Sequence, residues 1–66
     1  MTTYYEKIEI VGVSEKSYED AIQTAVKGAK DKYKELRWFE VIEFRGGISD
    51  SGNVQFQVVL KIAVVN

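Results

Sequence analysis

The sequence predicts a single α+β domain with the element order β-α-β-β and a three-stranded antiparallel sheet. Two observations predict it. Three segments alternate apolar and polar residues with the period of a strand, and one segment repeats apolar residues every three to four positions. A chain of 66 residues fits one domain, which we place at residues 1–66. The one helix should pack its apolar stripe against one face of the sheet.

The helix is expected from about Tyr18 to Glu35. Ser17 followed by Asp20 fits an N-cap with an acidic residue at the third position. Acidic residues stand in the first turn and lysines near the end, an order that matches the helix dipole. The apolar stripe that would face the sheet consists of Tyr18, Ala21, Ile22, Ala25, Val26, Ala29 and Tyr33.

The strands are expected at residues 4–13, 37–45 and 54–65. The pair Gly46-Gly47 and the polar residues 49–53 should form the turn between the last two strands, which would pair as a hairpin. The last strand has one unbroken apolar face, made of Val54, Phe56, Val58, Leu60, Ile62 and Val64.

The middle strand carries apolar side chains on both faces. Trp38, Ile42 and Phe44 should alternate with Phe39 and Val41, so a single helix leaves one of these sets uncovered. Cysteine is absent, so no disulfide can stabilise the thin core. Histidine, the commonest zinc ligand, is absent as well. A large uncovered apolar surface indicates a partner, and we expect other copies of the same chain to cover it.

Composition argues against several classes of function. A net charge of −1 is not the basic footprint of a nucleic-acid-binding protein. No apolar run approaches the roughly 20 residues of a membrane helix, and the first residues lack a signal-peptide pattern, so a cytoplasmic location is expected. Glu40 and Glu43 should lie on opposite faces of one strand, where they could not act together within a subunit. An enzyme is therefore the weaker alternative, and no catalytic or metal-binding residue is assigned.

Three segments resemble the dodecins, a family of small flavin-binding proteins. They are KIEIVGVSEKSYEDAIQTAV at residues 7–26, WFEVIEFRG at residues 38–46 and VQFQVVLKI at residues 54–62. The resemblance implies a sheet partly wrapped around the helix and twelve copies assembled as a hollow homododecamer. It also implies that flavins bind in antiparallel pairs at two-fold interfaces, between tryptophans of neighbouring subunits.

The same resemblance assigns three binding residues. Trp38 matches the stacking tryptophan, Gln57 matches the glutamine that bonds the polar edge of the isoalloxazine, and Arg45 matches an arginine that reaches a flavin phosphate. An indole stacks on aromatic rings, a glutamine amide both donates and accepts, and a guanidinium forks onto phosphate. FMN or riboflavin is the expected ligand, with lumichrome also possible. Loss of Arg45 is expected to weaken FMN and leave riboflavin nearly unchanged.

An indole stacked on an excited flavin would quench it by electron transfer, which suits storage or photoprotection rather than turnover. Each binding residue also has a plainer interpretation. Trp38 alone is typical of an interface aromatic, Gln57 of a solvated strand residue, and Arg45 of an ion-pair partner for Glu43. A ligand-free structural shell or interaction protein would use the same apolar surfaces and is the alternative function.

Overall fold

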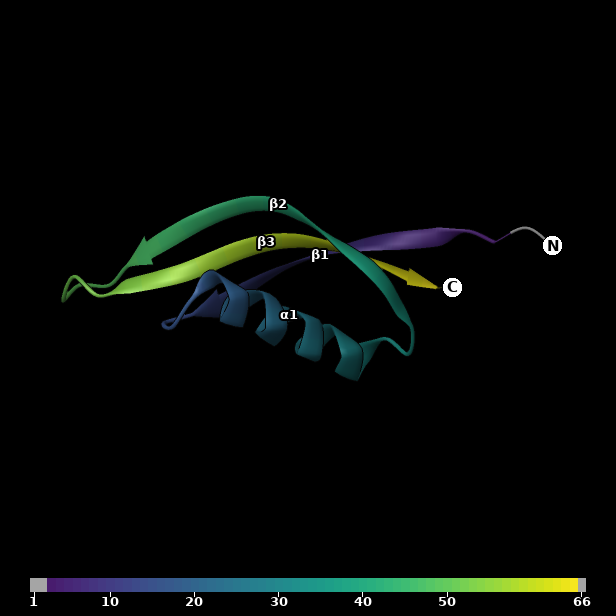
Figure 1. Cartoon of the computed structure of the whole chain (residues 1–66), viewed down its shortest axis with the longest axis horizontal. Helices are drawn as coiled ribbons and strands as arrows, with labels where there is room; N and C mark the ends of the chain where they lie inside the picture. Colours follow the sequence, from purple (N-terminus) through teal and green to yellow (C-terminus); the bar gives the residue numbers. More distant parts are fainter. Residues whose placement is uncertain (1–2, 66) are drawn as a thin grey trace.

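The structure, a computed structural model, describes residues 3–65; Met1, Thr2 and Asn66, at the ends of the predicted domain, lie outside the described residues. The elements are β1 (Tyr5–Ser14), α1 (Tyr18–Lys32), β2 (Leu36–Ile48) and β3 (Val54–Val65). The predicted β-α-β-β order is confirmed. The three strands form one antiparallel sheet in the order β1-β3-β2. The sheet curves over α1, which lies along its concave side (Figure 1).

Helix α1 begins at the predicted cap. The hydroxyl of Ser17 accepts a hydrogen bond of 3.0 Å from the backbone N–H of Asp20. The helix ends at Lys32 rather than at the predicted Glu35, because Tyr33 adopts an extended backbone with φ −121° and ψ 137°. The Tyr33 side chain then packs against the core. The apolar stripe therefore continues past the helix, although the helical backbone does not.

The core lies between α1 and the two strands that it packs against, β1 and β3. Gly12 of β1 allows a close approach, since a Cβ there would lie 2.1 Å from the carbonyl oxygen of Ala21 and 2.9 Å from the Ala25 Cβ. This contact explains why the helix presents alanines to the sheet. The buried residues of the core are Ala21, Ala25, Ala29, Val58, Leu60, Ile62 and Val64.

Strand β2 departs from the regular alternation predicted for it. Its pairing with β3 shifts between Leu36 and Trp38 and again between Val41 and Glu43, so Ile42 is an extra residue. Phe44 consequently shares the helix side of the sheet with Val41. The predicted set of Trp38, Ile42 and Phe44 on one face is wrong, because it treated the strand as regular.

The two glutamates of β2 were also placed wrongly. Glu40 pairs with Lys61 and Glu43 pairs with Val59, two partners that lie on the same face of β3. The extra residue at Ile42 therefore brings both carboxylates to one face rather than to opposite faces. Their positions therefore do not prevent Glu40 and Glu43 from acting together within a subunit.

The strand also continues through the glycine pair that was expected to start the turn. Gly46 pairs with Phe56 and Gly47 pairs with Gln55, so both belong to β2. The turn comprises residues 49–53, in which the N–H of Gly52 donates to the Ser49 carbonyl at 2.9 Å. Gly52 has a φ of +87°, a conformation that favours glycine.

The sheet face turned away from α1 is called the open face below. After the two shifts of register, Trp38 and Arg45 of β2 both lie on this face. Alternate residues of β3 and of β1 complete it. In the part of the chain that the structure describes, no helix has the length and hydrophobicity of a membrane span. The open face comprises Tyr5, Lys7, Glu9, Val11, Val13, Trp38, Glu40, Glu43, Arg45, Gly47, Gln55, Gln57, Val59, Lys61, Ala63 and Val65.

Candidate functional site

The three predicted binding residues all lie on the open face. Trp38 and Arg45 stand an odd number of positions apart on β2, so a regular strand would turn them to opposite faces. The extra residue at Ile42 corrects this, and both side chains share the face that Gln57 occupies on β3. The irregularity of β2 is therefore what makes a shared site on one face possible.

Arg45 and Gln57 are brought together within one chain. They are directly opposite each other on β2 and β3, and Arg45 Nε donates a hydrogen bond of 2.8 Å to Gln57 Oε1. Trp38 instead pairs with Ala63, six positions along β3 from Gln57. At about 3.3 Å per residue, that separation is roughly 20 Å. One chain thus carries two parts of a site at opposite ends of its open face.

The Trp38 indole is held by its neighbours. Its Nε1 donates to Glu40 Oε2 at 3.0 Å, and Lys7 Nζ lies 2.7 Å from the same oxygen. The Tyr5 ring meets the indole edge to face, with centroids 5.0 Å apart and an interplanar angle of 69°. Trp38 is still 43% exposed. Its orientation is fixed while part of its surface stays open for stacking.

Glu40 is the charged centre of this cluster. The hydrogen bond from Lys7 and then that from the Trp38 indole lower the pKa of Glu40 below its ordinary value of 4.5, with a smaller contribution from the charge of Lys61. The carboxylate is therefore ionised at neutral pH and accepts from both donors. Its negative charge lies beside the indole, where it would stabilise the positive charge left on the ring after loss of an electron.

Sequence reasoning missed the neighbours of Trp38. Glu40 could have been found, because it stands two positions from Trp38 and so shares its face. Lys7 and Tyr5 could not, since they lie on β1 and reach Glu40 and the indole only through the pairing of β1 and β2 with β3. No pattern in the sequence states that register.

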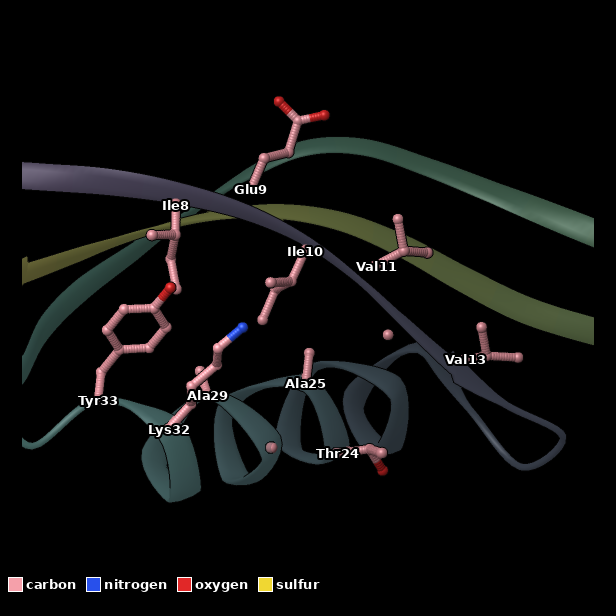
Figure 2. A pocket seen from close by; sticks show the side chains of 12 residues that line it. Ile8, Glu9, Ile10, Val11, Val13, Thr24, Ala25, Ala29, Lys32 and Tyr33 are labelled. Atoms are coloured by element: carbon pink, nitrogen blue, oxygen red, sulfur yellow. The ribbon is translucent and has the colours of Figure 1, made fainter.

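A groove lies elsewhere in the structure. A groove of about 520 Å³ runs between the free edge of β1 and α1. Figure 2 shows Ile8 and Ile10 pointing from β1 toward the helix, with Lys32 and Tyr33 pointing back toward the strand. None of the three predicted binding residues lines this groove. Among residues 3–65, no three acidic side chains come together as a metal site would require.

A comparison with known families agrees with this geometry. The family model described as Dodecin matches residues 4–65. This chain belongs to the dodecin family. Dodecins are small binding proteins rather than enzymes.

Two relatives and one solved structure illustrate the similarity. The dodecin of Thermus thermophilus is 45% identical over 62 residues, which cover 94% of this chain and 90% of the relative. The calcium dodecin of Mycobacterium tuberculosis is 30% identical over 59 residues, covering 89% and 83%. The dodecin structure from Streptomyces davaonensis superposes with a TM-score of 0.90 at 30% identity, covering 100% of this chain and 97% of that chain. The fold is thus that of solved dodecins.

Proposed function

We propose that this chain binds riboflavin or FMN and stores, buffers and photoprotects it at subunit interfaces of a hollow homododecamer. The observation that carries the proposal is the common placement of Trp38, Arg45 and Gln57 on the open face. The extra residue at Ile42 is needed for that placement. A surface whose stacking aromatic, amide and cation share one face has the chemistry that a flavin requires: a ring, a polar edge and a phosphate.

Self-association is supported by apolar exposure on both sides of the sheet. On the open face, Val11 and Val13 are 47% and 44% exposed. On the helix side, α1 covers β2 only in part: the Tyr18 ring meets Phe44, yet Phe44 and Ile48 are still 56% and 80% exposed. A domain of this size buries only about 60% of its unfolded surface by itself. Contact between copies would remove the remaining apolar surface from water.

The separation within one chain favours a site shared between two chains. Trp38 lies roughly 20 Å from Gln57 along the sheet, which is too far for both to contact one isoalloxazine ring in the same subunit. In a two-fold pair, Trp38 of one copy can approach Arg45 and Gln57 of the other. The tryptophans of two copies would then enclose a pair of flavins.

The proposed role follows from what surrounds the ring. The indole is an oxidisable donor, and Glu40 places a negative charge at its Nε1. An excited flavin stacked on it would return to the ground state by electron transfer and back-transfer before reacting with anything else. Quenching of this kind protects a stored flavin and leaves it chemically unchanged.

A riboflavin titration tests the proposal. We expect riboflavin emission to fall as assembled protein is added. We also expect denaturation of the purified protein to release FMN or riboflavin, which mass spectrometry identifies. Sedimentation in the same buffer should show a particle far larger than one chain. An assembled protein that leaves riboflavin emission unchanged would instead indicate the ligand-free shell, and a stable monomer would remove the site, which needs two chains.

A further inference from the structure

The Gln57 amide is held at its oxygen and lies close to a glycine at its nitrogen. Its Oε1 accepts the 2.8 Å hydrogen bond from Arg45 Nε. Its Nε2 lies over Gly47, at 2.8 Å from where a Cβ on that glycine would stand. A guanidinium only donates, so Arg45 determines which end of the amide is the oxygen. The amide nitrogen is thereby turned away from Arg45 and kept as a donor.

The backbone gives no reason for glycine at position 47. Among residues 3–65 the only glycine with a positive φ is Gly52, so Gly47 has a backbone that other residues can adopt. Glycine inside a strand weakens the strand and often marks a place where another group approaches closely. At Gly47 that group is the Gln57 amide.

The neighbouring glycine provides the contrast. A Cβ on Gly46 would meet only the backbone oxygen of Gln55, at an ordinary contact distance of 3.5 Å. Gly46 pairs with Phe56 and so faces the helix side, whereas Gly47 faces the open side. Of two adjacent glycines in one strand, only Gly47 makes room for a binding residue.

We infer that Gly47 is a positioning residue of the binding site, whose missing side chain lets Arg45 hold the Gln57 amide with its NH₂ group available to the ligand. The inference rests on the proposed flavin binding and adds the orientation of Gln57 to it. An amide held in this way offers its NH₂ group to the ligand as a hydrogen-bond donor, because its oxygen already accepts from Arg45. It selects a ring edge that presents a carbonyl oxygen, as a flavin pyrimidine does.

Arg45 consequently has two roles. Its Nε donates to Gln57, while none of the hydrogen bonds among residues 3–65 involves its terminal nitrogens. The terminal nitrogens are the ones that would meet a phosphate. The sequence alone predicted that loss of Arg45 would leave riboflavin affinity nearly unchanged. On this inference the loss should also weaken riboflavin, because riboflavin depends on the Gln57 amide that Arg45 orients.

The test compares Gly47→Ala with Gly46→Ala in riboflavin titrations followed by emission. We expect Gly47→Ala to weaken riboflavin by about threefold to tenfold, the size of one neutral hydrogen bond. Gly46→Ala should stay within about twofold of the original protein, because its Cβ makes only an ordinary contact. Gly47→Ala should fold, since the atom that it displaces is the end of a flexible side chain. Sedimentation of both variants checks this.

A second background separates the amide from other effects of the added methyl group, which would also lie 3.2 Å from Gln55 Oε1. In Gln57→Ala protein, adding Gly47→Ala should change riboflavin affinity by less than about twofold, because coupled positions are not additive. Equal penalties in both backgrounds, or equal behaviour of the two glycine variants, would overturn the inference and leave flavin binding intact. Original protein that does not bind riboflavin would overturn flavin binding itself, and the inference with it.

If Gly47→Ala does not assemble, Arg45→Lys gives the same answer. Lysine keeps the positive charge but lacks the Nε donor that holds the amide. We expect it to weaken riboflavin, which has no phosphate, by about threefold to tenfold. Unchanged riboflavin affinity in this variant would contradict the positioning of Gln57.

Discussion

The helix-covered face and the open face of the sheet differ in what fixes their side chains. On the helix-covered face, Leu60 is fully buried and Gly12 has no room for a methyl group. On the open face, Trp38 and Arg45 are exposed and are oriented by hydrogen bonds to neighbouring side chains. Close packing resists any added atom, whereas hydrogen-bonded pairs orient a residue and leave its surface accessible. The first face supplies stability, and the second presents the side chains that we propose for flavin binding.

The largest expected effect is on the helix-covered face. Gly12→Ala should lower the free energy of unfolding by about 1–3 kcal/mol, toward the upper end, because the added Cβ meets the backbone of α1 rather than a movable side chain. Urea unfolding at a fixed protein concentration measures it, since the association between copies that we propose would make stability depend on concentration.

Gly28→Ala is the matched control for Gly12→Ala. Nothing lies within 4 Å of a Cβ at Gly28, and the residue stands inside α1. Alanine there should raise the free energy of unfolding by about 0.5–1 kcal/mol through its better helix propensity. Similar small effects of both substitutions would show that the two glycines do not differ in packing, and the contrast between the faces would lose its main support.

The next effect belongs to the open face. Arg45→Ala should weaken FMN by about 1.5–3 kcal/mol, nearer the lower value because the side chain is exposed and salt screens it. Riboflavin should weaken less, through Gln57 alone. Calorimetric titrations of both ligands at low and high salt measure the difference, which should shrink as salt rises. An equal loss for both ligands would mean that Arg45 does not contact the phosphate.

The smallest effect concerns Glu40. Because contacts with Lys7 and Trp38 lower its pKa in the folded protein, its contribution to stability is present above pH 4.5 and is lost as the pH falls below that value. The chain has a single tryptophan, so its emission reports on this cluster. We expect a change in Trp38 emission with an apparent pKa below 4.5 that Glu40→Gln abolishes.

Glu43→Gln is the control for Glu40→Gln, since Glu43 shares the open face but makes no contact with the indole among the hydrogen bonds of the described residues. It should leave the acid-dependent change of Trp38 emission in place. If Glu40→Gln titrates like the original protein, another group is responsible for the change and the Lys7–Glu40 pair does not orient the indole.

The helix-covered face could be predicted from the sequence, and the open face only in part. The regular alternation of Val58, Leu60 and Ile62 and the cap at Ser17 gave the core, the helix start and the element order. The helix end was placed too late because Tyr33 continues the apolar stripe in an extended backbone. Period and capping are local properties, so a sequence displays them directly.

The open face depends on pairing between distant segments. The apolar run around Ile42 is compatible with either face, so the sequence alone does not reveal the extra residue that places Trp38 and Arg45 on the same face. Gly47 was assigned to a turn because paired glycines are typical of turns. The family resemblance identified three residues that do lie on one face, namely Trp38, Arg45 and Gln57. The side chains that orient them are determined by the register of the strands, which the sequence does not display.

The central claim is that Trp38 on the open face stacks on a flavin between two copies of the chain. Riboflavin titrations of the original protein and of Trp38→Ala, followed by emission, test it most directly, with sedimentation to show that both are assembled. We expect Trp38→Ala to lose most of the affinity and the quenching while keeping the size of the particle. Equal affinity and equal quenching in the variant would contradict stacking between tryptophans.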